Sequence, residues 1–194
     1  MNDFNSKETD QMRNLIYAIN LTVDGCSDHT KVGGSAEMLD YYTNFFEDID
    51  LIIYGRVTYE LMIPYWPDVI NDPTSEKEEV DFAKAFCAID KVVFSRTLES
   101  VEDNSRIVRK NLGDEIRKLK QQPGKNISVG GVDLPGQLIE LGLIDEFYIV
   151  VHPYIAGEGR RLFDHASLPE RLSLKLVDTK SFKSGAVAMH YVKQ

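Results

Sequence analysis

Residues suited to phosphate binding follow three short apolar runs of the sequence. The runs are LIIYG, KVVFS and NISVGG, and an arginine comes directly after each of the first two. An arginine guanidinium can hold a phosphate through two parallel hydrogen bonds, and glycines let a pyrophosphate approach the main-chain N–H groups at the start of a helix. The candidate residues are Gly55, Arg56, Thr58, Ser95, Arg96, Gly130 and Gly131. Their types predict a site for a phosphorylated small molecule.

Each of these motifs also has an ordinary structural explanation. Arg56 could pair with Glu60 one helical turn later, and Ser95 could cap a turn that leaves Arg96 at the surface. The two adjacent glycines are equally typical of a tight turn, and they match neither the G-x-G-x-x-G pattern nor the P-loop. The occurrence of all three motifs at predicted strand ends is what favours a ligand site.

Strands and helices alternate along the sequence and would bring these residues together. Short apolar runs predict buried strands, and apolar residues at three- and four-residue spacing predict helices. The strands are expected within residues 14–25, 51–55, 91–95, 106–109, 126–131 and 146–155. The helices are expected within residues 35–50, 56–66, 71–86, 112–124 and 134–143, with Pro64 as a helix stop. Two more strands around the KSG turn would end the chain as a hairpin.

This order of elements predicts an α/β fold of three layers. The central sheet would be mixed and mostly parallel, helices would cover both of its faces, and an antiparallel hairpin would lie at the C-terminal end. In open α/β sheets, ligands bind outside the carboxyl ends of the strands. Because parallel strands end at the same edge, the three motifs can face a single ligand.

Length and charge narrow the class of protein. The chain has 194 residues and a formal net charge of -9, which suits one domain at residues 13–194 after a flexible tail at residues 1–12. An acidic protein is a poor partner for nucleic acid. Because the sequence has neither a membrane-spanning run nor the apolar core of a signal peptide, we expect a cytoplasmic protein. The spacing of Cys26 and Cys87 predicts reduced thiols and no metal site.

The motifs follow one another in an order known from one family. The segments TVDG, IIYGRVTYELM, VVFSRTL and, above all, the block from Gly130 to Phe163 carry the similarity. Over residues 13–192 the sequence resembles the dihydrofolate reductase-like family, which includes the C-terminal reductase domain of riboflavin biosynthesis proteins. The resemblance implies a stand-alone domain of the dihydrofolate reductase-like fold, a homodimer, and NADPH bound at the strand ends.

The resemblance gives the first two strand ends a part in binding NADPH. Gly55, Arg56 and Thr58 would lie along the cofactor. Ser95 and Arg96 would bind the phosphate on the 2′-oxygen of the adenosine. A preference for NADPH over NADH would then depend on Arg96.

The third strand end would bind the pyrophosphate, through Gly130, Gly131 and Leu134. In dihydrofolate reductases the peptide that corresponds to Gly130–Gly131 is cis. A cis bond before a residue other than proline costs about 3–4 kcal/mol, so finding one here would indicate a functional constraint.

On the substrate side, the resemblance indicates Asp24 and Asp40 as catalytic candidates. Asp24 comes where the family has its substrate-side Asp-Gly pair and could orient a substrate or relay a proton; a plain turn residue is the alternative. Asp40 occupies the type of helix position from which dihydrofolate reductases extend a proton-relay carboxylate. Its alternative is a solvated helix residue.

Trp66 and Gly157 join Asp24 as predicted substrate-binding residues. Trp66 could line the wall of the pocket or belong to the core. Gly157 lies in AGEGRRLF, which could form a glycine loop over the substrate, with Arg160 or Arg161 available to an anionic group. A β-bulge and turn is the alternative for this segment.

Two departures from the family leave the substrate open. The H-x-E and P-C-x-x-C signature of the deaminase half of riboflavin proteins is absent, so we expect no zinc deamination. The Pro-Trp pair that dihydrofolate reductases carry after the first strand is also missing. We expect an NADPH-dependent reductase of a small heterocycle that is pterin-like or like 5-amino-6-(5-phosphoribosylamino)uracil. The alternative is a non-catalytic nucleotide-binding or ligand-sensing module.

Overall fold

The computed structural model describes most of the chain, over residues 12–28, 34–102, 104–162, 168 and 170–194. Except for Met12, the predicted tail lies outside these residues. No helix in the described ranges is long and apolar enough to cross a membrane.

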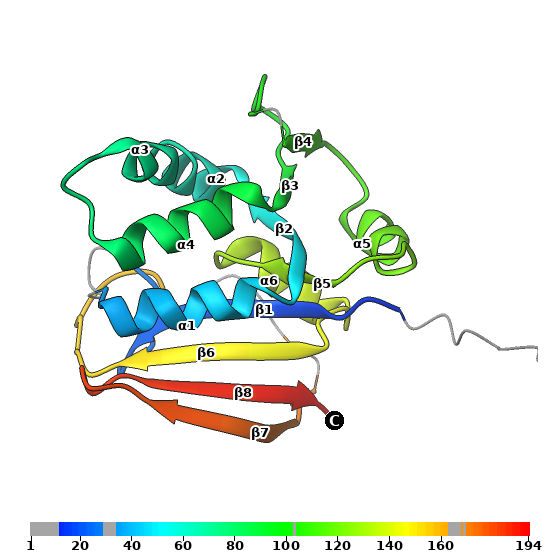
Figure 1. Ribbon diagram of the computed structural model, residues 1–194. Coiled ribbons are helices and arrows are strands. Elements are labelled where there is room, and N and C mark those ends of the chain that lie inside the picture. The colour runs from blue at the N-terminus through cyan, green and yellow to red at the C-terminus, as the bar shows by residue number, and fades with distance from the viewer. Residues whose placement is uncertain (1–11, 29–33, 103, 163–167, 169) are drawn as a thin grey trace, which may run out of the picture.

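Eight strands form one sheet in the order β4-β3-β2-β5-β1-β6-β8-β7 (Figure 1). The strands are β1 Leu15–Thr22, β2 Ile49–Gly55, β3 Asp90–Phe94, β4 Ser105–Val108, β5 Asn126–Val129, β6 Glu146–His152, β7 Leu174–Ser181 and β8 Val187–Lys193. Strands β1 to β6 pair in parallel, whereas β8 pairs antiparallel with both β6 and β7. The predicted mostly parallel sheet with a C-terminal antiparallel hairpin is therefore confirmed.

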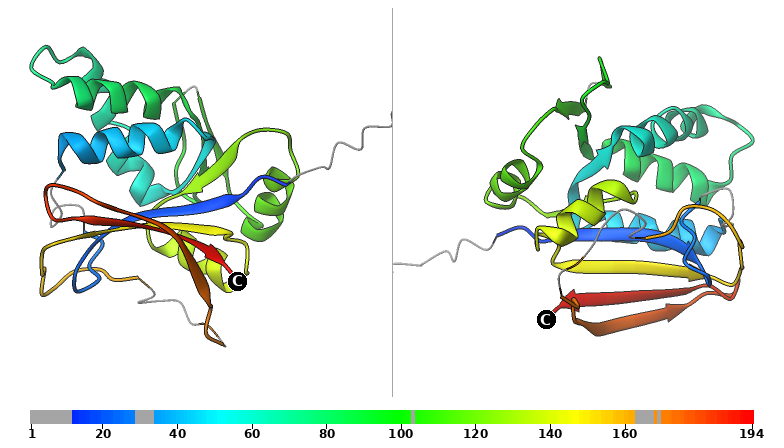
Figure 2. Two further views of the ribbon diagram at one scale, coloured as in Figure 1. Left: turned by 60° about the horizontal axis from the view of Figure 1, so that its bottom comes forward. Right: turned by 180° about the vertical axis from the view of Figure 1, so that it is seen from behind.

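Helices lie on both faces of the sheet, and each face has its own core (Figure 2). The helices are α1 Ala36–Phe46, α2 Arg56–Met62, α3 Tyr65–Asn71 and α4 Lys77–Ala88 on one face, and α5 Leu112–Lys120 and α6 Asp133–Glu140 on the other. Alternate residues of β2 serve the two cores: Ile52 packs with Phe86 of α4, and Ile53 with Leu138 of α6. The expected three layers are confirmed.

Local sequence signals explain where the helices begin and end. Ser35 caps α1, because its Oγ accepts a hydrogen bond from the Met38 N–H at 3.3 Å. As predicted, α2 ends just before Pro64. A second helix, α3, begins directly after that proline and was not predicted. Proline lacks an N–H, and the first N–H groups of a helix have no partner within it, so Pro64 suits the start of α3.

A buried lysine closes the junction between α4 and β3. Lys91 is 2% exposed, and its Nζ donates hydrogen bonds to the main-chain oxygens of Phe86 at 2.9 Å and Ile89 at 2.6 Å. The last carbonyls of a helix need such partners from outside the helix. Burial lowers the pKa of Lys91 to about 8. The lysine thereby helps to fix where β3 begins. Because Ser95 directly follows β3, the lysine also helps to fix the position of Ser95.

This pKa predicts a change of stability with pH. Between about pH 8 and pH 10.5 the unfolded chain binds more protons at Lys91 than the folded chain, so the contribution of Lys91 to the free energy of unfolding rises with pH. Relative to Lys91→Met, the wild type should gain on the order of 2 kcal/mol between pH 8 and pH 10. Urea unfolding of the wild type and of Lys91→Met at both pH values measures it, with Lys84→Met on the exposed side of α4 as the control. The same change with pH in Lys91→Met as in the wild type would show that Lys91 makes no such contribution.

Candidate functional site

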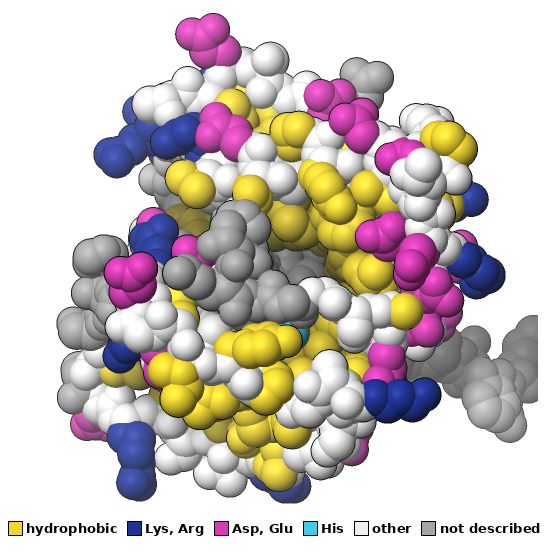
Figure 3. Space-filling view, turned by 90° about the vertical axis from the view of Figure 1, so that its left-hand side faces the viewer, with side chains coloured by type: hydrophobic (Ala, Val, Ile, Leu, Met, Phe, Trp, Pro, Cys, Tyr) yellow, Lys and Arg dark blue, Asp and Glu magenta, His cyan; other side chains and the backbone are white. Residues whose placement is uncertain are grey.

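The carboxyl ends of β3, β2, β5, β1 and β6 form a row along one edge of the sheet. Gly55 at the end of β2 lies opposite Phe94 of β3. Gly130, directly after β5, donates its N–H to the main-chain oxygen of Ile53 at 3.2 Å. Figure 3 looks onto this side of the molecule, which is hollowed in its middle and carries hydrophobic side chains around the hollow. The fold thus brings the three predicted motifs to one edge.

Side chains at Gly130 or Gly131 would collide with the protein itself. A Cβ on Gly130 would lie 2.8 Å from a ring carbon of Tyr54, and a Cβ on Gly131 would lie 2.6 Å from Oγ1 of Thr58. Gly131 also has a φ of 91°, which favours glycine, and its carbonyl accepts a hydrogen bond from the Tyr17 hydroxyl at 2.8 Å. Close packing therefore requires both glycines. The described residues contain no cis peptide bond, so these two are joined in trans, unlike the corresponding pair in dihydrofolate reductases.

Gly55 differs from this pair because open space lies beside it. No described atom lies within 4 Å of a Cβ built there, and its φ of -78° is accessible to any residue. A bare main chain without a steric cause leaves room for a ligand. Farther along the row, Leu134 is 8% exposed, so its side chain belongs to the core. Its N–H lies in the first turn of α6, where helix N–H groups lack helical partners.

Arg56 begins α2 but pairs within its own helix. Its Nη1 lies 2.6 Å from Oε2 of Glu60, and both side chains are 44% exposed. This is the surface pair that the sequence offered as the alternative. Exposed pairs of this kind contribute only about 0–1 kcal/mol, so a phosphate could take the place of Glu60. The part of Arg56 in cofactor binding stays a prediction.

The loop after β3 has a shape fixed by Ser95. The Ser95 side chain accepts hydrogen bonds from the N–H groups of Thr97 at 3.2 Å and Leu98 at 2.9 Å. Arg96 is exposed in this turn. A residue that the sequence did not indicate supports the loop: Arg109 donates to the main-chain oxygens of Arg96 at 3.2 Å and Leu98 at 2.9 Å. Its contribution depends on the pairing of β4 with β3, which no local pattern encodes.

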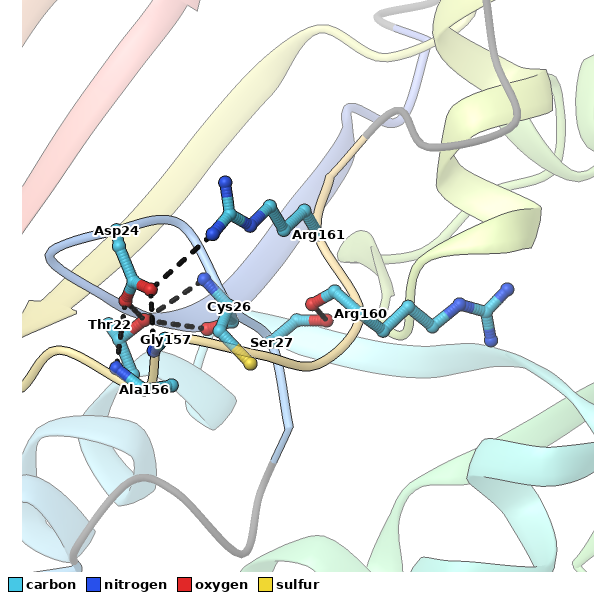
Figure 4. A network of polar contacts seen from close by, with 8 residues as sticks. All are labelled: Thr22, Asp24, Cys26, Ser27, Ala156, Gly157, Arg160 and Arg161. Carbon is cyan, nitrogen blue, oxygen red and sulfur yellow. Dashed lines mark hydrogen bonds and ion pairs between the residues drawn. The ribbon is translucent and has the colours of Figure 1, made fainter.

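Asp24 joins the loop after β1 to the loop after β6 (Figure 4). Its carboxylate accepts hydrogen bonds from the Thr22 hydroxyl at 2.6 Å and from the N–H groups of Ala156 at 3.0 Å and Gly157 at 2.9 Å. These hydrogen bonds, led by that from Thr22, lower the pKa of Asp24 to about 2. The carboxylate is therefore ionised at neutral pH, which favours a positioning role over proton donation. Its catalytic role stays a prediction.

The loop after β6 is held at further points along the edge. Arg161 points toward Asp24, with 3.5 Å between Nη2 and Oδ2, whereas Arg160 points away from it (Figure 4). Arg160 pairs with Asp133 at the start of α6. The N–H of Ser27 donates to the main-chain oxygen of Arg160 at 2.8 Å. The glycine-containing segment thus runs from the β1 loop to α6 and borders one end of the row.

Asp40 and Trp66 lie in surroundings that suit a structural role, as a solvated helix residue and a core residue respectively. Asp40 is exposed on α1. Trp66 packs against Phe82 of α4, with 4.4 Å between ring centroids, as part of the core on that face. A catalytic part for Asp40 and a substrate contact for Trp66 stay predictions.

His152 is a buried polar residue at the end of β6. Its Nε2 lies 3.1 Å from Oδ1 of Asn20, and burial lowers the pKa of the imidazole. The ring is therefore neutral at pH 7 and serves packing and hydrogen bonding. No group of three or more His, Cys, Asp or Glu side chains in the described ranges could hold a metal ion.

An apolar cavity of about 480 Å³ lies on the α6 face of the sheet, away from the strand ends. Its lining is mostly apolar, with Tyr17, Ile139 and Phe147 among its residues, but it also contains the exposed side chains of Glu170 and Arg171. Binding an anion requires N–H groups or cations, and this wall offers a single cation, Arg171, which shares the lining with a carboxylate. The row of strand ends, with its arginines and the N–H groups of α6, is therefore the stronger candidate for a nucleotide site.

Comparisons with known proteins agree with this architecture. Residues 13–188 match the family model described as the RibD C-terminal domain. The chain is 35% identical over 190 residues to the uncharacterized protein YyaP of Bacillus subtilis, an alignment that covers 93% of this chain and 95% of the relative.

Two solved structures share the fold. A protein of Shewanella sp. PV-4 described as a riboflavin biosynthesis protein has a TM-score of 0.72 at 19% identity, over 93% of this chain and 99% of that one. Dihydrofolate reductase of Enterococcus faecalis, solved in complex with NADP(H), has a TM-score of 0.63 at 13% identity, over 93% and 96% of the two chains. At these identities the likeness concerns the fold alone.

The different surroundings of Gly131 and Gly55 predict different effects of the same substitution. Gly131→Ala should lower the free energy of unfolding by about 1–3 kcal/mol, because the alanine would be strained at positive φ and would crowd Thr58. Gly55→Ala should change it by less than about 1 kcal/mol. Urea unfolding followed by the fluorescence of Trp66, the single tryptophan, measures both. Equal losses in the two variants would contradict the described packing.

Proposed function

We propose that this chain, which belongs to the RibD C-terminal domain family, is an NADPH-dependent reductase of a small heterocyclic substrate. Family and fold are those of reductases, and the proposal concerns the cofactor and the reaction. The observation that carries it is the row of strand ends, where the open main chain of Gly55 and the close-packed Gly130-Gly131 pair lie on neighbouring strands. The homodimer implied by the family stays a prediction.

The residues along the row fit the parts of NADPH. The space beside Gly55 would admit the middle of an extended dinucleotide, and the first N–H groups of α6, that of Leu134 among them, would face the pyrophosphate. Arg96 would meet the 2′-phosphate, because its side chain is exposed at the end of β3. When bound, NADPH supplies the hydride, and the protein's task is to hold the acceptor against it.

The far end of the row is proposed to hold the substrate. The glycine-containing segment of the loop after β6 borders this end, and Asp24 fixes that segment through the N–H groups of Ala156 and Gly157. An ionised Asp24 can orient a donor group of a heterocycle, such as a ring N–H or an amino group. Substrates that are pterin-like or like 5-amino-6-(5-phosphoribosylamino)uracil offer such groups.

Cofactor selectivity tests the proposal. Arg96→Ala should raise the Kd for NADPH about 10- to 100-fold and leave that for NADH nearly unchanged, since a charge-assisted contact to a phosphate contributes about 1.5–3 kcal/mol. Nicotinamide fluorescence measures both constants, and Arg117→Ala on α5 controls for the loss of an exposed arginine. Equal losses for the two cofactors would contradict the part given to Arg96.

Turnover separates an enzyme from a binding module. NADPH oxidation is followed with dihydrofolate and with the aminouracil ribose phosphate as acceptors. Absence of NADPH binding in the wild type at millimolar concentration would refute the reductase. Tight binding without oxidation of either acceptor would instead favour a nucleotide-binding module.

A further inference from the structure

A second cavity, of about 250 Å³, lies between α1 and the amino ends of the strands. Its lining includes Ile16, Ile49, Asn126 and Glu146, each of which is the first or second residue of its strand. The row of strand ends proposed for NADPH is at the opposite edge of the sheet, and the length of β1 puts about 20 Å between the two edges. This α1 cavity is therefore separate from the proposed nucleotide and substrate sites.

Apolar and aromatic side chains form much of the α1 cavity. Ile16 and Ile49 are each 3% exposed and belong to the core. Tyr41 and Phe45 of α1 and Tyr148 of β6 add three rings. The ring centroids of Phe45 and Tyr148 are 5.0 Å apart. Because the face of an aromatic ring attracts a cation and apolar side chains suit an alkyl chain, these walls fit both parts of an organic cation.

Two carboxylates add negative charge to this lining. The Glu146 side chain is 15% exposed, and both of its oxygens are held: Nδ2 of Asn14 donates to Oε1 at 2.6 Å, and Nε2 of His190 lies 2.7 Å from Oε2. Asp48 is exposed and lies two residues after the last residue of α1. The C-terminal end of a helix carries partial negative charge. The helix end and the two carboxylates therefore attract a cation together.

Two further observations agree with a negative potential at this place. The pKa of Tyr148 is raised to about 12, first by burial and then by neighbouring groups that include Glu146 and Asp48. A potential that opposes the tyrosinate anion favours a cation. Next to the cavity, the chain already binds an ammonium group of its own, because Nζ of Lys125 donates to the main-chain oxygen of Glu47 at 2.6 Å.

We propose that the α1 cavity binds a small alkylammonium ion, with the ammonium group at Asp48 and Glu146 and the alkyl chain against the aromatic rings. The amide oxygens of Asn44 and Asn126 also belong to the lining and can accept N–H bonds, which favours a primary amine over a quaternary one. Among the described residues no group of three His, Cys, Asp or Glu could hold a metal ion, so an organic cation fits this cavity better. The inference concerns a second ligand site and does not depend on the proposed function.

Calorimetry on the full chain with a matched pair of probes tests the proposal. Putrescine, a four-carbon diamine, should bind, whereas butane-1,4-diol, which has the same carbon chain without the charges, should not. Asp48→Asn keeps the shape of the side chain but removes its charge, so it should weaken putrescine binding about 10-fold. Tyr148→Leu should also weaken binding, because it removes the ring, whereas Tyr148→Phe should keep the affinity within about threefold.

Asp40→Asn is the matched control, because it removes the same charge from an exposed position of α1, roughly two helical turns before Asp48. It should leave the affinity for putrescine unchanged. Equal losses in Asp40→Asn and Asp48→Asn would indicate attraction by the overall charge of the chain and overturn the proposal. Wild-type protein that binds neither probe, or binds both equally, would overturn it as well. Thermal unfolding of each variant shows whether the fold is retained.

Discussion

Parallel pairing of β4, β3, β2, β5 and β1 is the constraint on which the site depends. It makes all these strands end at one edge, although residues 22, 55, 95, 108 and 129 are far apart in the chain. Main-chain hydrogen bonds set the register, and the two cores hold the sheet from both faces. A one-residue slip of any strand would turn its side chains to the other face and move its end out of line. The position of every candidate ligand-binding group follows from this pairing.

The row of strand ends is characterised less by charge than by main chain that is either uncovered by side chains or held in place by hydrogen bonds. Gly131 is glycine because Thr58 and a φ of 91° require it, whereas the space beside Gly55 is open and has room for a ligand. The Ser95 side chain and Arg109 fix one end, and Asp24 with its three donors fixes the other. A site built in this way is preorganised, so little conformational entropy is lost when a ligand binds.

The sequence predicts the frame of this protein better than the roles of its side chains. Alternating apolar runs and helical spacing indicate the sheet, its hairpin and most of the helices, because burial acts on each element locally. Helix α3 was not predicted from the sequence, because Pro64 marks both the end of one helix and the start of the next. Arg109 could not be found from the sequence, since its partners lie on a neighbouring strand. The spacing of Arg56 and Glu60 offers their pairing only as an alternative, and side-chain geometry decides in its favour.

A crystal structure of the protein grown with NADPH tests the central claim most directly. The account predicts electron density for the nucleotide across the ends of β3, β2 and β5, with the pyrophosphate at Gly130-Gly131 and the 2′-phosphate beside Arg96. Density in the apolar cavity on the α6 face, or a nucleotide with its 2′-phosphate turned away from β3, would contradict it.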